Sequence, residues 1–152
     1  MLVARGSTLY FSEPYRYGLY NPVSGYLPFE APITMVAPTP KGLYVAADQT
    51  YWLPDLPATD VRTILPFGAL PHSDVVLPGS SGEAQRCAWM SQRGAVIAED
   101  MGNVSLPQDT ALVFSPAARG SLAVRERDGE RWLVVARSGV EPNTVTARTL
   151  GD

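Results

Sequence analysis

Short apolar runs separated by polar turns recur along the chain. Residues 43–46 form such a run, Asp48 and Gln49 interrupt it, and residues 50–53 resume it with β-favouring side chains. A similar unit spans residues 94–106, where an acidic turn at 99–103 separates two apolar stretches. This spacing is too short for helices and predicts strands joined by tight turns.

Four segments follow this scheme, with hairpins or meanders predicted at residues 2–12, 33–53, 86–98 and 121–136. The last is the clearest, because residues 121–126 alternate apolar and polar side chains before the turn at Asp128 and Gly129. Shorter strands are expected at 73–77, 104–106, 111–114 and 145–150, and a loop at 79–82. Residues 61–65 fit either a strand or a single helical turn.

The fold class that follows is all-β, built from antiparallel hairpins and meanders in a single β-rich domain of residues 1–152. Fourteen prolines and thirteen glycines, spread along the chain, favour many turns over long helices. The turn glycines recur at intervals of about 35 to 50 residues, which suggests a partial or small β-propeller. A β-sandwich or barrel satisfies the same pattern. An incomplete propeller would have open strand edges, which another chain could pair with.

The connection at residues 13–32 is long and rich in aromatic side chains. It contains four prolines and four tyrosines in twenty residues, and the prolines exclude a continuous helix. Long loops without regular structure are usually functional or interfacial. Tyrosine offers a rigid ring with a polar tip, which suits a contact surface. The candidate interface residues are therefore Tyr15, Tyr17, Tyr20 and Tyr26, with an ordinary packed loop as the alternative.

No constellation of catalytic, cofactor-binding or metal-binding residues emerges from the sequence. His72 is the only histidine and Cys87 the only cysteine, which argues against a zinc cluster, a catalytic triad or an intrachain disulfide. Four acidic residues could serve glycoside hydrolysis, but each sits where a turn favours a carboxylate: Glu13, Asp48, Glu99 and Asp100. We expect Cys87 to be a buried small hydrophobe and His72 to lie in a surface loop. The tryptophans, Trp52, Trp89 and Trp132, are expected in the core.

Charge limits the range of partners. The net charge of −3 provides no strong field for nucleic acid, so nucleic acid is an unlikely partner. Five arginines between residues 119 and 137 alternate with acids, which indicates a solvated hairpin. No apolar run approaches the roughly 18 residues of a membrane span. Only 18% of residues are charged, which leaves room for a surface covered by partners.

Three stretches together carry a family resemblance. They are Leu9-Tyr-Phe-Ser-Glu-Pro14 with Tyr20-Asn-Pro22, then Gly42-Leu-Tyr-Val-Ala-Ala-Asp48, then Ala88-Trp-Met-Ser-Gln-Arg-Gly-Ala-Val-Ile-Ala98. In this order they resemble β-propeller-like virion proteins from the neck or tail of tailed bacteriophages and prophages. The resemblance covers residues 2–106, and the present chain is shorter than many such proteins.

The resemblance implies a structural role without catalysis, a location in the virion, and copies of itself and other virion proteins as partners. One alternative is a carbohydrate-binding or glycan-cleaving β-domain of a receptor-binding tail protein. That reading requires a concave face with Tyr or Trp beside one or two carboxylates. A general bacterial protein-interaction module is a third reading.

Overall fold

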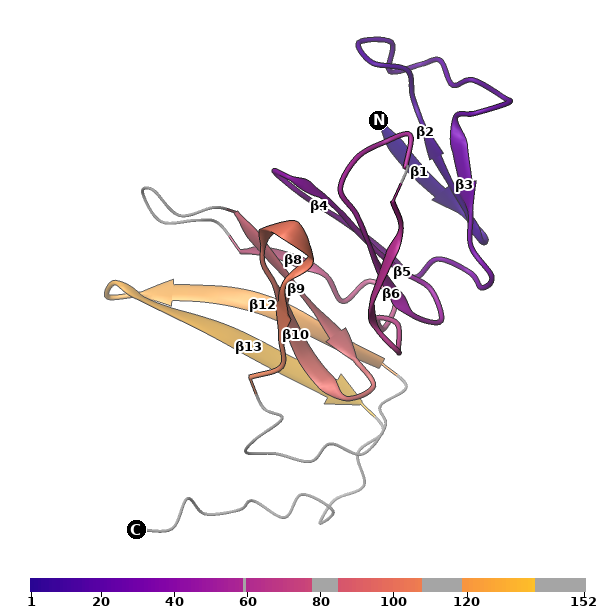
Figure 1. Cartoon of the computed structure of the whole chain (residues 1–152). Coiled ribbons are helices and arrows are strands. Elements are labelled where there is room, and N and C mark those ends of the chain that lie inside the picture. The colour runs from indigo at the N-terminus through magenta and orange to yellow at the C-terminus, as the bar shows by residue number, and fades with distance from the viewer. Residues whose placement is uncertain (59, 78–84, 108–118, 139–152) are drawn as a thin grey trace.

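A computed structural model describes residues 1–58, 60–77, 85–107 and 119–138 (Figure 1). The described residues are almost entirely β, arranged in antiparallel hairpins and meanders as the apolar pattern predicts. The first sheet contains β1 (Leu2–Arg5), β2 (Thr8–Phe11) and β3 (Tyr26–Pro28). The second contains β4 (Met35–Thr39), β5 (Gly42–Ala46), β6 (Thr50–Leu53) and β7 (Arg62–Leu65).

The third sheet contains β8 (Val75–Leu77), β9 (Arg86–Ser91), β10 (Gly94–Ala98) and β11 (Val104–Ser105). A single-turn 3-10 helix, η1 (Asp100–Gly102), connects β10 to β11. The last hairpin pairs β12 (Arg119–Arg127) with β13 (Glu130–Ser138). In every sheet the strands lie side by side in chain order, so each sheet is a simple meander.

The sheets stack face to face in the order in which the chain makes them. Leu9 of the first sheet packs with Leu43, Val45 and Leu53 of the second. On the opposite face of the second sheet, aromatic side chains meet the third sheet, and the Tyr44 and Trp89 ring centroids lie 5.5 Å apart. These alternations follow the two-residue period of a strand, which sends successive side chains to opposite faces.

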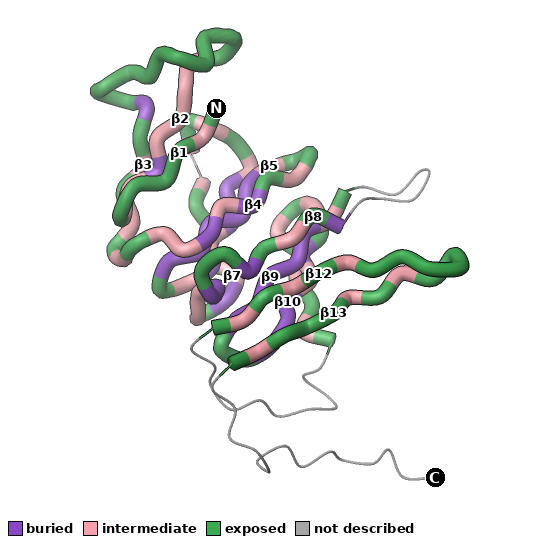
Figure 2. The backbone as a smooth tube through the Cα atoms, turned by 180° about the vertical axis from the view of Figure 1, so that it is seen from behind, coloured by how far each residue is buried: buried purple, intermediate pink, exposed green. Residues whose placement is uncertain are grey.

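The third sheet is in turn covered by the last hairpin, where Leu122 and Leu133 pack against Met90. The central strands of sheets two and three (β5, β6, β9 and β10) are therefore buried on both faces, which explains why they read as nearly continuous apolar runs. The last hairpin is covered on one face only, so residues along β12 alternate between partly buried and exposed. Figure 2 shows the buried residues concentrated in the middle layers, with exposed chain at both ends of the stack.

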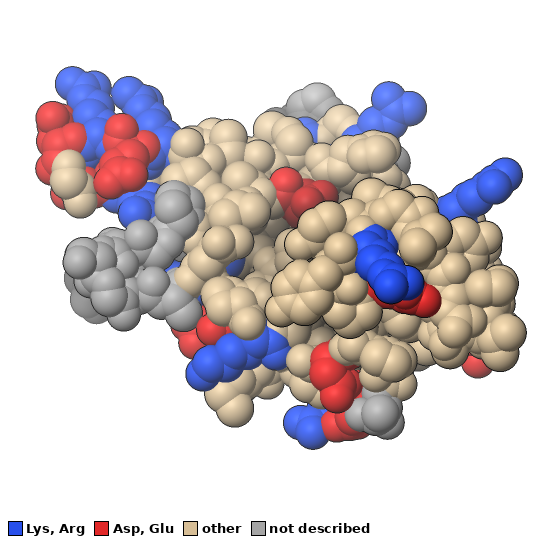
Figure 3. All heavy atoms as spheres, turned by 90° about the horizontal axis from the view of Figure 1, so that it is seen from above, with Lys and Arg blue, Asp and Glu red and all other residues tan. Residues whose placement is uncertain are grey.

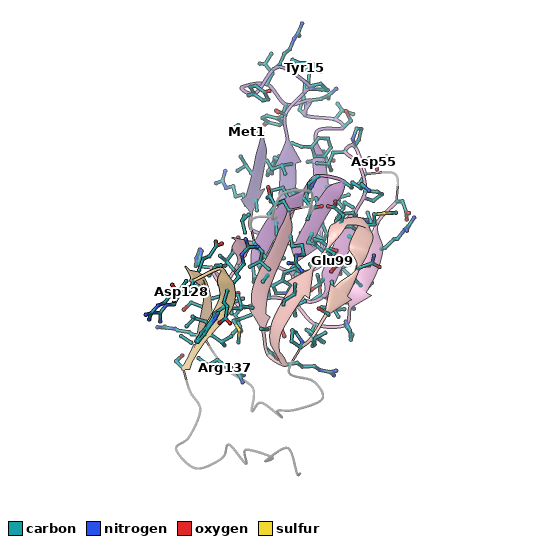
Figure 4. All side chains as sticks on the ribbon, turned by 90° about the vertical axis from the view of Figure 1, so that its left-hand side faces the viewer. Met1, Tyr15, Asp55, Glu99, Asp128 and Arg137 are labelled. Carbon is teal, nitrogen blue, oxygen red and sulfur yellow. The ribbon has the colours of Figure 1, made fainter. Side chains whose placement is uncertain are left out.

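Within the described residues, the stack stays open. The first sheet and the last hairpin lie at opposite ends, at the upper right and the lower left of Figure 1, and no sheet closes into a barrel. Figure 4 shows Tyr15 at the top of the molecule and Asp128 at its left edge. The barrel alternative is therefore wrong for this part of the chain. Successive four-stranded meanders stacked in chain order agree with a partial propeller-like or sandwich arrangement.

Several local predictions need correction. The connection at 13–32 includes a strand, β3, which pairs with β2 and widens the first sheet. Residues 62–65 are a strand and not a helical turn. Trp132 is 56% exposed, whereas Trp52 and Trp89 are buried as expected. The predicted strands at 111–114 and 145–150 and the loop at 79–82 lie outside the described residues.

Candidate functional site

The tyrosine-rich loop between β2 and β3 forms the far end of the first sheet. Its four candidate tyrosines are all exposed, from 44% for Tyr26 to 92% for Tyr15. Tyr26 begins strand β3, and the other three lie in the loop itself. The structure therefore places these side chains at one end of the molecule, pointing into solvent. Exposed aromatic side chains gathered at one end of the molecule are compatible with a contact surface.

The loop holds its shape through its own backbone. The Glu13 amide donates to the Leu19 carbonyl at 2.9 Å, and the Leu19 amide donates to the Arg16 carbonyl at 2.9 Å. At its return, the Gly25 amide donates to the Asn21 carbonyl at 2.7 Å, and the Asn21 side-chain oxygen accepts from the Val23 amide. These bonds satisfy backbone groups that a disordered loop would leave to water. The tyrosines are thus displayed on an ordered scaffold.

The loop continues into the outer face of the first sheet. The strand register places Val3, Tyr10 and Tyr26 in one row across β1, β2 and β3, on the face opposite buried Leu9. Tyr20 folds back onto this row, with its ring edge-on to Tyr10 at a centroid distance of 5.8 Å. We call the surface made by Val3, Tyr10, Tyr20 and Tyr26 the tyrosine face. Val3 and Tyr10 are not in the interface set predicted from the sequence, although the alternation in β2 indicates the outward position of Tyr10.

A hollow of about 410 Å³ opens beneath the loop, on the inner side of the first sheet. Leu2, Phe11, Leu56 and Pro57 are among its apolar lining residues, while Glu13 and Tyr17 contribute a carboxylate and an aromatic ring. The volume falls in the range of small-ligand sites, which combine apolar walls with a few polar groups. Glu13 also lies 3.7 Å from the Arg16 guanidinium in an exposed ion pair.

The other three acidic candidates lie in or beside turns and do not line the hollow. The Asp48 carboxylate accepts a hydrogen bond of 3.2 Å from the Tyr51 hydroxyl. Burial raises the pKa of Tyr51, and the nearby Asp48 carboxylate raises it further. The Glu99 backbone closes the turn before β11, its amide donating to the Asn103 carbonyl at 2.9 Å. Asp100 begins η1. Of the four acidic residues considered for glycan chemistry, Glu13 alone lines the hollow, so the hollow does not bring two of them together.

His72 is exposed in a loop, as expected, and its neighbour Ser73 is buried. The Ser73 hydroxyl donates to the Leu70 carbonyl at 2.6 Å and accepts from the Met90 amide at 3.0 Å. These bonds fasten the loop to the third sheet and leave Ser73 inaccessible as a nucleophile. Among the described residues, no group of three or more His, Cys, Asp or Glu side chains is placed to hold a metal ion.

The buried titratable groups belong to the core. Cys87 is buried between the second and third sheets, and that burial raises the pKa of its thiol to about 12, with smaller contributions from Asp74 and Asp100. Burial likewise raises the pKa of Tyr44 well above its usual value of about 10. A thiol held in its neutral form is a poor nucleophile. Cys87 is therefore a packing residue, as its apolar sequence context predicts.

The surface is sparsely charged. Figure 3 views the molecule from above and shows a largely uncharged surface, with charges of both signs gathered on the left at the turn of the last hairpin. Burial lowers the pKa of Arg137 on β13.

Among the described residues, no helix has the length and apolarity to cross a membrane.

Comparison with known proteins identifies no relative: no family model, no curated protein and no solved structure matches this chain.

Proposed function

We propose that this protein is a structural virion component of a tailed bacteriophage or prophage, assembling into the tail or neck through its tyrosine-rich loop and its open strand edges. The observation that carries the proposal is the ordered display of Tyr15, Tyr17, Tyr20 and Tyr26 at one end of an open β-stack. Tyrosine is among the residues enriched in the cores of protein interfaces.

The edges support the same role. In the described chain, β1 pairs only with β2, and its outer edge is not paired with another strand. Such an edge offers unpaired backbone groups to an incoming strand from another protein. The family-like stretches at residues 9–14, 42–48 and 88–98 direct the proposal toward virion proteins. They fall on β2, β5 and the β9–β10 hairpin, which are framework strands.

The test is the protein content of purified particles. Mass spectrometry of virions from the host that encodes this chain should detect it at a fixed copy number per particle. A double variant, Tyr17→Ala with Tyr20→Ala, should reduce incorporation at least tenfold while the protein still folds. A control double variant, Val61→Ala with Val76→Ala, changes exposed apolar residues away from the loop and should incorporate normally. Absence of the wild-type chain from intact particles would overturn the proposal.

A second candidate, a glycan-binding domain of a receptor-binding tail protein, is favoured by the hollow that both Tyr17 and Glu13 line. Sugars bind where an aromatic ring meets their apolar face and polar groups meet their hydroxyls. Binding on a glycan array should be weakened by Tyr17→Ala and by Glu13→Gln. Asp48→Asn is the matched control, because Asp48 does not line the hollow. An array with no bound glycan removes this candidate.

A further inference from the structure

The two ends of the stack each present a sheet face that no described layer covers. At one end is the tyrosine face, where Val3, Tyr20 and Tyr26 are exposed. At the other end is the outer face of the last hairpin. Its register pairs Ala123 with Val134 and Arg125 with Trp132, on the face opposite Leu122 and Leu133.

The outer hairpin face is apolar at its centre. Val134 is 47% exposed, beside Trp132 and across from Ala123. Trp132 is held in place by a hydrogen bond of 3.1 Å from its indole nitrogen to the Glu130 carboxylate. We call the surface made by Ala123, Arg125, Trp132 and Val134 the tryptophan face. An isolated exposed apolar residue needs no explanation, but a tryptophan and a valine together on one sheet face indicate a contact site.

We propose that the tyrosine face of one copy of this chain packs on the tryptophan face of the next copy. This inference rests on the proposed assembly function and names a second copy of the chain as the partner. The chain itself makes this kind of contact three times, each time by stacking one sheet face on the next through alternate apolar side chains. A contact between copies would continue the same stack across the chain boundary.

The two faces are chemically complementary. The tyrosine face offers aromatic rings, and Arg125 lies directly across from Trp132 on the facing surface. A guanidinium over a tyrosine ring gains a cation–π interaction that strengthens as water is excluded. Arg5 is the only charged residue in the three strands of the first sheet. Burying the tyrosine face therefore removes little charge from water. On the outer hairpin face, the register places Arg119 at one end and Arg127 with Glu130 at the other, so the apolar centre at Trp132 and Val134 carries the contact and these charges lie around it.

The contact joins two different surfaces, so each copy keeps one face of each kind available. Such a heterologous contact produces a ring if the rotation between copies closes, and a filament if it does not. A contact made only by two tyrosine faces would instead stop at a dimer. This difference makes the inference testable with single-face variants.

The experiment measures mass in solution by light scattering and sedimentation across protein concentrations. Wild type should form concentration-dependent oligomers. Tyr26→Glu on the tyrosine face and Val134→Glu on the tryptophan face should each raise the dissociation constant at least tenfold and give monomers. An equimolar mixture should form a one-to-one dimer and nothing larger, because each variant retains one intact face. That dimer also demonstrates that both variants are folded. Val61→Glu, an exposed site on neither face, should assemble as wild type does.

Three results would overturn the inference: a monomeric wild type at all concentrations, a Val134→Glu variant that still dimerises, or variants that do not associate when mixed. The proposed function fails by a different measurement. If the chain is found in virions but wild type is monomeric, the virion role stands and the self-stacking contact falls. If the chain self-assembles as expected but is absent from virions, the contact between copies stands and the proposed virion role is wrong.

Discussion

The hydroxyl of Tyr44 on β5 donates a hydrogen bond of 2.6 Å to the backbone carbonyl of Glu99, which follows β10 in the next sheet. The same hydroxyl lies 3.1 Å from the Asn103 carbonyl, so one side chain ties the second sheet to both ends of the turn around η1. Its ring lies against Trp52, with centroids 4.6 Å apart. The Tyr44 ring thus packs in the apolar core, while its hydroxyl bonds to backbone carbonyls where the second and third sheets meet.

Removing this hydroxyl should loosen the junction. We expect Tyr44→Phe to lower the free energy of unfolding by about 1–3 kcal/mol, because the ring remains while partly buried carbonyls lose their donor. Urea denaturation followed by circular dichroism measures the change. Tyr51→Phe is the matched control, since its hydroxyl bonds an exposed carboxylate at 3.2 Å, and it should cost less than about 0.5 kcal/mol. Equal losses in both variants would contradict the bridging role of Tyr44.

Gly25 should determine the shape of the tyrosine-rich loop. A β-carbon at this position would lie 2.6 Å from the Asn21 carbonyl oxygen and 2.8 Å from the Asn21 nitrogen, both backbone atoms. We therefore expect Gly25→Ala to displace the loop, with faster amide hydrogen exchange across residues 13–25 and weaker assembly. Gly18→Ala is the control, because no atom lies within 4 Å of its added carbon. Unchanged exchange in Gly25→Ala would show that the loop tolerates the β-carbon.

The inner layers could be predicted from the sequence because their strands are short apolar runs bounded by glycine turns. Gly94 and the stretch 95–98 indicate a turn and a strand without any tertiary information. Strand β3 could not be predicted in the same way. It is short, includes Pro28, and is stabilised by pairing with β2 rather than by its own propensity.

The candidate site was partly predictable. A cluster of tyrosines in a proline-rich loop is visible in the sequence, and their exposure follows from the loop. The row that joins Val3 to Tyr10 and Tyr26 depends on strand register, which the sequence does not specify for a short sheet. Trp132 was misplaced because hydrophobicity alone does not reveal which face of a hairpin meets another layer.

Alkaline pH should destabilise the protein through two buried acids. In the unfolded chain the Cys87 thiol ionises near its usual pKa of about 8.5 and the Tyr44 phenol near about 10, whereas burial raises both pKa values in the folded chain. The unfolded state therefore releases protons first, and stability falls as pH rises above about 8.5 toward 12. Each group that ionises only on unfolding lowers the free energy of unfolding by at most about 1.4 kcal/mol per pH unit.

Urea midpoints measured at half-unit steps from pH 7 to 11 test this dependence, with Cys87→Ala as the comparison. In that variant the decline should begin near pH 10, since the phenols with raised pKa values, Tyr44 and to a smaller degree Tyr51, remain. Identical profiles for the two proteins would show that the thiol does not contribute.

Tryptophan fluorescence should separate Trp132 from the two core indoles and report on stacking between copies. Trp52 and Trp89 are buried, so acrylamide should quench about one-third of the emission of the dilute protein, all of it from Trp132. Trp132→Phe should remove that accessible component and leave a blue-shifted spectrum. If the tryptophan face is an interface, raising the concentration of wild type should shield Trp132 and lower the accessible fraction, while Tyr26→Glu should remain quenchable. A wild-type fraction that stays constant while oligomers form would place the contact elsewhere on the molecule.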